Sequence, residues 1–242
     1  MNIIKLDATD STNQFLKTLS KETDLENFTV VYANSQTKGK GQMGATWVSE
    51  AGKNLTMSIL IKNLLTENNQ IFDLNVVVAC SIFEVLQSLK IPNISIKWPN
   101  DMMADNKKIG GILIENIIKT EQIISIVGIG INVNQTNFVD LPAASSLKCV
   151  TNITFEINEI MLLISTKIEQ KCKKFLSDSS LHFWNFYHDH LFKKNILMAF
   201  EMQGGQKFMG IIREVEKNGK IKIQMEDESF SSFGLKEVKM LY

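Results

Sequence analysis

The sequence predicts an α+β protein in which helices pack on a β-sheet and a small β-domain follows. Short apolar segments with alternating polarity recur through the first 133 residues, and residues 71–90 interrupt them with apolar positions at helical spacing. From about Ile196 the pattern changes to short alternating strands separated by turn residues. The length of 242 residues accommodates one large domain and one small one. We therefore predict domains at 1–191 and 192–242.

The composition excludes several classes of protein. Lysine plus arginine equals aspartate plus glutamate, 26 against 26, so no general positive field attracts nucleic acid or acidic membranes. The three cysteines are odd in number and far apart, which is typical of reduced thiols and not of disulfides or a zinc site. The N-terminus lacks a signal-peptide pattern, and the longest apolar run is too short to span a bilayer. We expect a cytoplasmic protein that binds neither nucleic acid nor membranes.

A strand is predicted at residues 3–6, and Asp10-Ser11-Thr12-Asn13 follows it. Asp10 or Ser11 can cap a helix that runs to Leu19. A strand that leads into a helix N-terminus also provides a site for anions and polar ligand groups. The local pattern fits both roles.

A glycine-rich loop follows the strand predicted at residues 29–33. Gly39, Gly41 and Gly44 alternate with lysines in a segment whose backbone N–H groups could approach a phosphate closely. The segment lacks the G-K-[ST] ending of a P-loop, and no helix is predicted after it, as a Rossmann fingerprint requires. Taken alone, the pattern favours a flexible surface loop.

The central segment, residues 94–117, predicts a hairpin. A strand ending near Pro99 places Asn100 and Asp101 at its tip, because proline cannot donate to a β-ladder. Turn residues at 104–107 precede an apolar run that contains paired glycines, which indicate close approach of a ligand or another backbone. A charged surface hairpin with a core tryptophan is the alternative.

The remaining elements are a strand at 54–61, a strand at 122–133, and amphipathic helices at 158–175 and 179–190. In the strand at 122–133, three residues share one face and could clear it for a flat ligand or for another packed element: Gly128, Gly130 and Asn132. Histidines 188 and 190 do not share a helical face, so we expect no metal site there.

Together and in this order, the motifs resemble those of biotin–protein ligases. The resemblance rests on Asp10-Ser-Thr-Asn13, Gln36-Thr-Lys-Gly-Lys-Gly-Gln-Met-Gly-Ala-Thr-Trp47, Asn54-Leu, Lys97-Trp-Pro-Asn-Asp101, Lys108-Ile-Gly-Gly-Ile-Leu-Ile-Glu115 and Gly128-Ile-Gly-Ile-Asn132. Residues 233–238 resemble the close of the family's C-terminal domain, so the likeness extends over the whole chain. It implies a mixed β-sheet packed by helices, the class II synthetase-like fold shared by biotin and lipoate ligases, with a C-terminal SH3-like β-barrel.

The resemblance also implies a reaction. Biotin and ATP form biotinyl-5'-AMP, and biotin is then transferred to a specific lysine of a biotin carboxyl carrier domain of a carboxylase. Two anions must be brought together in the first step, so cations are needed to offset their charge. The cations would be Lys40, Lys108 and a Mg²⁺ ion near Asp101.

Motif matching assigns the individual residues. Those implied to contact biotin are Ser11, Thr12, Asn13, Gln36, Lys40, Gly41, Gln42, Lys108, Gly111, Gly128 and Gly130. Those implied to contact ATP or the adenylate are Trp47, Asn100, Lys108 and Asn132. The catalytic set is Lys108, Lys40, Asp101 and Lys97, with Asp101 also the implied Mg²⁺ ligand.

The chain departs from the family pattern in its loop. The familiar G-R-G-R-R-G-R is Gly39-Lys-Gly-Gln-Met-Gly-Ala45 here, so Lys40 keeps a charge without the bidentate fork of arginine. We expect weaker retention of the intermediate. Because the first strand begins at Ile3, we expect a short form without the DNA-binding helix-turn-helix of some members.

Three alternatives remain at this point. A lipoate–protein ligase or octanoyltransferase shares the catalytic fold, although the polar residues 11–13 suit a ureido ring better than a plain acyl chain. The others are a non-catalytic sensor that holds biotin or its adenylate, and an interaction scaffold built on the C-terminal strands. The sequence leaves open which carrier is modified and whether a homodimer forms.

Overall fold

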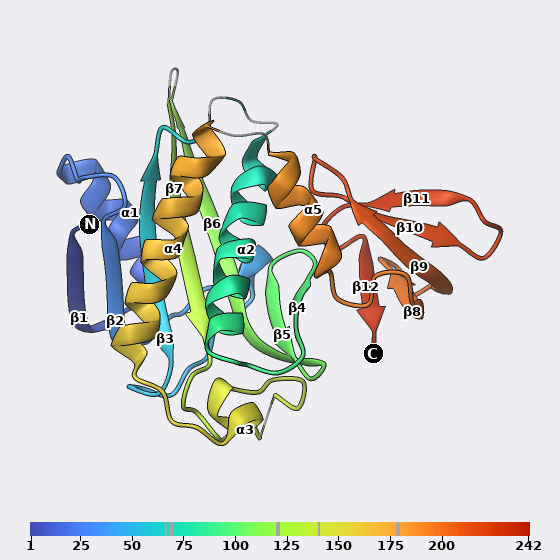
Figure 1. Ribbon diagram of the computed structural model, residues 1–242, viewed down its shortest axis with the longest axis horizontal. Helices are drawn as coiled ribbons and strands as arrows, with labels where there is room; N and C mark the ends of the chain where they lie inside the picture. The colour runs from blue at the N-terminus through green and yellow to red at the C-terminus, as the bar shows by residue number, and fades with distance from the viewer. Residues whose placement is uncertain (66, 68–69, 120–121, 140, 178–179) are drawn as a thin grey trace.

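A seven-stranded mixed sheet forms the body of the protein, and a five-stranded antiparallel sheet follows it (Figure 1). The computed structural model describes all residues except 66, 68–69, 120–121, 140 and 178–179. The large sheet has the order β1-β2-β3-β7-β6-β5-β4. Its strands are β1 (Ile3–Thr9), β2 (Val30–Gln36), β3 (Leu55–Lys62), β4 (Ile94–Lys97), β5 (Asp101–Ala104), β6 (Lys107–Lys119) and β7 (Gln122–Ile131). The predicted α+β class is confirmed.

The first two strands set the mixed character of the sheet. β1 and β2 pair in parallel, whereas every other neighbouring pair is antiparallel. Parallel neighbours need a crossover, and helix α1 (Thr12–Glu22) provides it. The crossover brings the N-terminus of α1 to the carboxyl end of β1, beside the end of β2.

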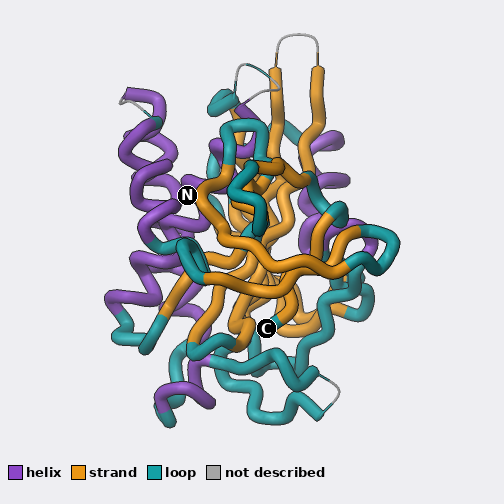
Figure 2. The backbone as a smooth tube through the Cα atoms, turned by 90° about the vertical axis from the view of Figure 1, so that its right-hand side faces the viewer, coloured by secondary structure: helices purple, strands orange, loops and turns teal. Residues whose placement is uncertain are grey.

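Helices cover both faces of the large sheet, and Figure 2 shows them on either side of the strands. Val30 belongs to the larger core, whereas its neighbour Val31 packs in a smaller core with Leu16 of α1. The larger core contains most of α2 (Ile71–Ser88) and one side of α4 (Ile157–Ser177), together with residues of α5 (Leu181–Asp189). Strand residues alternate between faces, so the two cores lie on opposite sides.

Helix α2 is apolar around most of its circumference. By length and hydropathy it is the one helix in the described residues that could cross a membrane, but 72% of it is buried inside the protein. A helix that is apolar on all sides and covered on all sides is a core helix. The predicted packing of residues 71–90 against the sheet is confirmed, with the helix ending at Ser88.

The central segment contains three strands, where the sequence predicted two. Residues 101–104 form β5, which pairs with β4 on one side and β6 on the other. The turn predicted at 104–107 is confirmed, with Asp105 and Asn106 at φ values of 47° and 63°. Aspartate and asparagine adopt this left-handed backbone more readily than most residues. The single predicted hairpin is therefore a three-stranded meander.

Two short elements were not predicted. Helix α3 (Leu147–Thr151) begins where the hydroxyl of Ser146 accepts a hydrogen bond from the backbone N–H of Cys149, 3.1 Å away. A 3₁₀ turn, η1 (Gln42–Gly44), lies within the glycine-rich loop. The helix predicted at 179–190 spans Leu181–Asp189, and residues 178–179 of that prediction lie outside the described part.

The C-terminal sheet has the order β11-β10-β9-β8-β12 and contains the predicted Asn-Gly turn. Its strands are β8 (Leu197–Met202), β9 (Lys207–Val215), β10 (Ile221–Met225), β11 (Phe230–Phe233) and β12 (Val238–Leu241). Specific contacts fix it to the body: Nε2 of His188 lies 2.9 Å from the carbonyl oxygen of Val215, and the indole N–H of Trp98 donates to Gly219, 2.8 Å away. The small β-domain agrees with the expected fold, and its boundary near residue 192 stays a prediction.

Candidate active site

A cavity of about 200 Å³ opens on the face of the large sheet that carries α1. Residues from six parts of the chain line it: the start of α1, the end of β2, the glycine-rich loop, β3, the β4–β5–β6 meander and the end of β7. The lining includes Ser11, Thr12, Asn13, Gln36, Lys40, Gly41, Gln42, Trp47, Asn100, Asp101, Lys108, Gly111, Gly128 and Gly130. Segments far apart in the sequence thus meet around one space.

Two glycines of β7 allow other side chains to approach the sheet. A Cβ on Gly128 would lie within 3.0 Å of the amide of Asn13, and one on Gly130 would lie 2.6 Å from the indole of Trp47. Real Cβ atoms essentially never come this close to another atom. The sequence left open whether these glycines clear a strand face for a flat ligand or for another packed element; here they make room for the amide and the indole that form the cavity wall.

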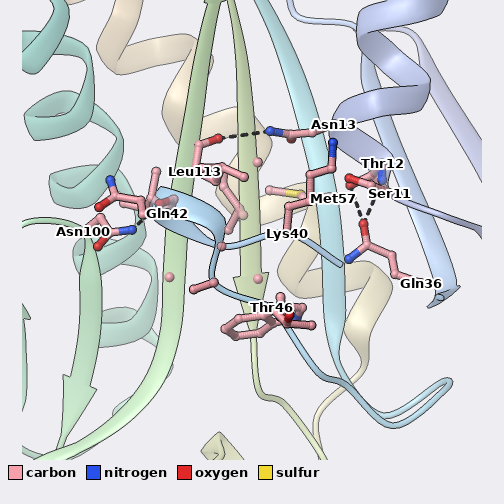
Figure 3. Close-up of a pocket in the computed structure, with 18 of the residues that line it drawn as sticks. Ser11, Thr12, Asn13, Gln36, Lys40, Gln42, Thr46, Met57, Asn100 and Leu113 are labelled. Carbon is pink, nitrogen blue, oxygen red and sulfur yellow. Dashed lines mark hydrogen bonds between the residues drawn. The ribbon is translucent and has the colours of Figure 1, made fainter. Parts of the chain in front are cut away.

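A hydrogen-bonded network closes one end of the cavity, and Figure 3 shows part of it. The backbone N–H of Thr12 donates to Oε1 of Gln36 at 2.7 Å, and the Thr12 hydroxyl lies 3.1 Å from the same oxygen. Oγ of Ser58 lies 2.8 Å from the Thr12 hydroxyl oxygen and 2.6 Å from Oδ1 of Asn13. The residues of this network are polar and uncharged, and we call this part of the cavity the amide end.

The opposite end is charged. The ammonium of Lys108 on β6 lies 2.6 Å from Oδ1 of Asp101 on β5. Gly111 pairs with Asp101 across the ladder, and a Cβ there would touch both members of the ion pair at 3.4 to 3.5 Å. The amide of Asn100 donates to the carbonyl oxygen of Ile112, which holds the hairpin tip against β6. We call this the charged end.

The glycine-rich loop folds into a narrow turn over the cavity (Figure 3). The backbone N–H of Gly41 donates to the carbonyl oxygen of Ala45 at 2.7 Å, and Lys40 and Thr46 form an isolated antiparallel β-bridge. The ammonium of Lys40 lies 3.4 Å from Oε1 of Gln14, which is a weak contact for a cation. The loop also reaches the C-terminal sheet, because Lys236 donates to the carbonyl oxygen of Met43 at 3.0 Å.

The start of the loop is fixed by Asp10. Its carboxylate accepts hydrogen bonds from Thr37 at 2.6 Å and from Lys38 at 2.9 Å, and these bonds hold the pKa of Asp10 below its usual range. Ser11 is the N-cap residue of α1, but its side chain makes no capping bond. Capping by Asp10 or Ser11 was one of the two predicted roles; the hydroxyl of Ser11 lines the cavity instead.

Residues 6–134, more than half of the chain, match a family model described as "Biotin/lipoate A/B protein ligase family". The chain belongs to the biotin/lipoate A/B protein ligase family. All of the residues that line the cavity fall within the matched range.

Individual members of the biotin/lipoate ligase family are similar over different lengths. "Bifunctional ligase/repressor BirA" of Escherichia coli is 34% identical over 132 residues, covering 54% of this chain and 40% of that protein. "Biotin--[acetyl-CoA-carboxylase] ligase" of Mycobacterium tuberculosis is 24% identical over 195 residues, covering 79% and 71%. The chain thus spans about 40% of the length of the first curated relatives that it matches.

Similarity to a solved structure of the family extends over nearly the whole chain. "Biotin protein ligase from Aquifex aeolicus in complex with biotin and ATP" has a TM-score of 0.80 and 27% identity, covering 99% of this chain and 98% of that one. The mixed sheet with its appended C-terminal sheet is therefore the arrangement of a biotin protein ligase.

Two residues assigned from the family motifs do not line the cavity. The ammonium of Lys97 lies 3.0 Å from the hydroxyl of Tyr242 and 4.6 Å from its ring centroid, in a neighbouring groove beside the C-terminal sheet that shares Gln42 and Asp101 with the cavity. Asn132 follows β7 and is buried, with its amide donating to the carbonyl oxygen of Ser145 at 2.9 Å. The structure gives Asn132 a role in holding the segment that leads into α3.

Several lining or supporting residues had no role assigned to them from the sequence. Met57, Ile112, Leu113 and Ile129 form apolar parts of the wall, and Ser58 and Glu115 hold the amide end from behind. These residues look like ordinary members of strands. Only the strand neighbours and the position of α1 bring them to the cavity.

Proposed function

We propose that this protein activates biotin with ATP to form biotinyl-5'-AMP and then transfers biotin to a lysine of a biotin carboxyl carrier domain. The names of the relatives support this reaction, since they are biotin–protein ligases and a biotin–[acetyl-CoA-carboxylase] ligase. A similar solved structure is described as a complex with biotin and ATP.

The observation that carries the proposal is the polarity of the cavity. Its amide end offers uncharged donors and acceptors, which match the ureido ring of biotin. Its charged end offers the ammonium of Lys108, and Lys40 lies in the loop above. A ligand with a neutral polar ring and an anionic tail fits this arrangement from end to end.

In the first step, a carboxylate oxygen of biotin attacks the α-phosphorus of ATP. The new P–O bond forms as the bond to the β-phosphate oxygen breaks, and pyrophosphate leaves. Lys108 and Lys40 offset the negative charge that the two reactants bring together, which is the main electrostatic barrier to this reaction. Lys108 can turn from Asp101 to the ligand because both groups line the same cavity.

In the second step, the neutral amine of a carrier lysine attacks the acyl carbon of the mixed anhydride. The C–N bond forms, the C–O bond to AMP breaks, and the amine loses a proton to solvent or to the departing phosphate. The adenylate is prone to hydrolysis, so the narrow turn of the glycine-rich loop over the cavity serves to exclude water until the carrier arrives.

We assign contact with the nucleotide base to Trp47. Its indole lies against Gly130, and Lys108 lies 5.9 Å from its ring centroid. Its Nε1 atom is buried and makes no hydrogen bond to any described residue. An aromatic face beside the charged end of the cavity suits stacking on adenine.

Asp101 is the residue that fits a magnesium ion. It is the one carboxylate among the described residues that line the cavity, and Mg²⁺ is commonly held by one or two carboxylates together with substrate phosphates. When bound, the ion would neutralise phosphate charge. Catalytic participation of Lys97, a homodimer and a cytoplasmic location stay predictions from the sequence.

Lipoate or octanoate is the second candidate substrate. The wall between the two ends of the cavity is apolar, with Met57, Leu113 and Ile129 exposed to it, and an acyl chain could lie there. The amide end distinguishes the candidates, because its donors and acceptors would be left without partners by a plain acyl chain.

The deciding experiment is ATP–pyrophosphate exchange, run separately with biotin, lipoate and octanoate. Exchange with biotin alone is the expected result. Exchange with lipoate or octanoate instead would transfer the protein to the other branch of the family. Tight binding of biotin without exchange would identify a non-catalytic biotin-binding protein and contradict the proposal.

A further inference from the structure

Glu115 does not line the cavity but contacts Asn13, one of its wall residues. Its Oε2 atom accepts a hydrogen bond from Nδ2 of Asn13 at 2.9 Å, and its Oε1 atom lies 3.4 Å from the ammonium of Lys17. The same Nδ2 atom donates to the carbonyl oxygen of Leu113 at 3.3 Å. The amide nitrogen of Asn13 therefore has two oxygen acceptors on one side.

These two acceptors fix the orientation of the Asn13 amide. A carboxylate and a peptide carbonyl can only accept, so a reversed amide would place oxygen against oxygen. Asn13 is 3% exposed, so water does not relieve such a contact. Its Oδ1 atom must then face Ser58, whose hydroxyl is 2.6 Å away and must donate to it.

The orientation of the Asn13 amide determines which groups of the network donate and which accept at the cavity. Ser58 has a single proton and gives it to Asn13, so at 2.8 Å from Thr12 it can only accept. The proton of Thr12 therefore points to Ser58 or to Oε1 of Gln36, and the Thr12 oxygen keeps a lone pair for a ligand. Oε1 of Gln36 is occupied by the Thr12 backbone N–H, so its NH₂ group remains as a donor.

We infer that Glu115 is a positioning residue that sets the hydrogen-bond polarity of the amide end, and with it the selectivity for a cyclic urea. The inference rests on the proposed function. A cyclic urea has both N–H donors and a carbonyl acceptor, and the amide end offers an acceptor at Thr12 and donors at Gln36. Glu115 acts through Asn13 and does not line the cavity.

Two variants of Glu115 test this role. In Glu115→Ala the Asn13 amide is free to reverse, and we expect the KM and the Kd for biotin to rise about tenfold or more, with kcat and the KM for ATP nearly unchanged. In Glu115→Gln the side-chain carbonyl can still accept from Asn13, so a smaller increase is expected. Exchange assays give the KM values, and titration calorimetry of biotin alone gives a Kd that does not depend on turnover.

Glu84→Gln is the matched control. Glu84 is 28% exposed against 27% for Glu115, and it also pairs with lysine, 2.7 Å from Lys171, but it lies on α2 away from the cavity. Its substitution should leave the Kd for biotin unchanged. An equal loss of biotin affinity in the Glu84 and Glu115 variants, or an equal rise in the KM for ATP and for biotin, would contradict the inference. It would show that Glu115 contributes only to general stability.

The Asn13→Ala background tests whether the effect passes through Asn13. There, adding Glu115→Ala should weaken biotin binding no further, because the amide that Glu115 orients is gone. A full additional loss would overturn the inference. Unaltered biotin binding in an active Glu115→Ala enzyme would overturn it without touching the proposed function, whereas a wild-type protein that neither binds biotin nor supports exchange would remove both.

Discussion

Lys108 and Asp101 form a 2.6 Å ion pair on neighbouring strands of the central meander. The pair is half shielded, with 37% of the lysine side chain and 17% of the aspartate side chain exposed. Before a substrate binds, the main cation of the cavity is therefore neutralised by the protein itself. An anionic ligand that recruits Lys108 must compete with Asp101 or bring a cation for it.

Replacing Lys108 by alanine should nearly abolish adenylate formation. The substitution removes the cation and leaves the carboxylate of Asp101 to repel biotin and ATP, so biotin-dependent exchange should fall roughly a hundredfold or more. Lys107→Ala, which alters the exposed neighbour, is the matched control. Exchange at the wild-type rate in the Lys108 variant, with an unchanged melting temperature, would show that another group carries the reaction.

Alanine substitutions at Gly128 and Gly130 of β7 should affect the two substrates differently. Gly128→Ala displaces Asn13 and should raise the KM for biotin, whereas Gly130→Ala displaces Trp47 and should raise the KM for ATP. Overpacking of this kind costs about 1–3 kcal/mol of folding free energy. Where about 1 kcal/mol of that strain is relieved only without the substrate, its affinity falls about fivefold. Each variant is the control for the other, and parallel changes in both KM values would contradict the assignment of the two ends.

Phenylalanine in place of Tyr187 should stabilise the protein. The Tyr187 hydroxyl is fully buried, makes no hydrogen bond to any described residue, and has its pKa raised by desolvation. Removing an unsatisfied buried hydroxyl should gain roughly 1 kcal/mol, which raises the melting temperature by about 2–4 °C in a chain of this size. Calorimetry on both proteins measures this, and a lower melting temperature for the variant would show that the hydroxyl has a partner.

One thiol per native chain should react with Ellman's reagent at pH 8. Burial raises the pKa of Cys80 and of Cys172 to about 12, whereas Cys149 is exposed. Only thiolate reacts, so the two buried thiols should respond after unfolding, bringing the total to three. Because their folded-state pKa values lie above the usual value of about 8.5, the stability they contribute is present below that pH and is lost as the pH rises toward 12. Two or more fast thiols at pH 8 would contradict this burial.

Local pattern predicted most of the elements because strands and helices impose their periods on the residues that form them. β5 was not predicted, because Asp101-Met-Met-Ala104 shows no alternation of polar and apolar residues and lies between two turns. Its place in the sheet depends on β4 and β6 on either side. Helix α3, of five residues, is too short to show a period.

The site was predictable to the extent that its residues belong to motifs. Thr12, Lys108 and Trp47 were assigned by motif match, and the structure places all three around one cavity. Lys97 and Asp101 belong to one motif and both line the groove beside the C-terminal sheet, but only Asp101 also lines the cavity, because the ammonium of Lys97 contacts Tyr242. The contacts of Ser58 and Glu115 with Asn13 could not be predicted from the sequence, because they span 45 and 102 residues.

The hairpin tip at residues 98–100 has a consequence for how the two sheets can be recombined with those of relatives. Trp98 binds Gly219 of the C-terminal sheet, while Asn100, two residues later, holds the cavity wall. Lys236 reaches back to Met43 in the loop over the cavity. A chimera that exchanged only the C-terminal sheet with a relative would break these contacts. A working graft must carry the tip and the loop with it.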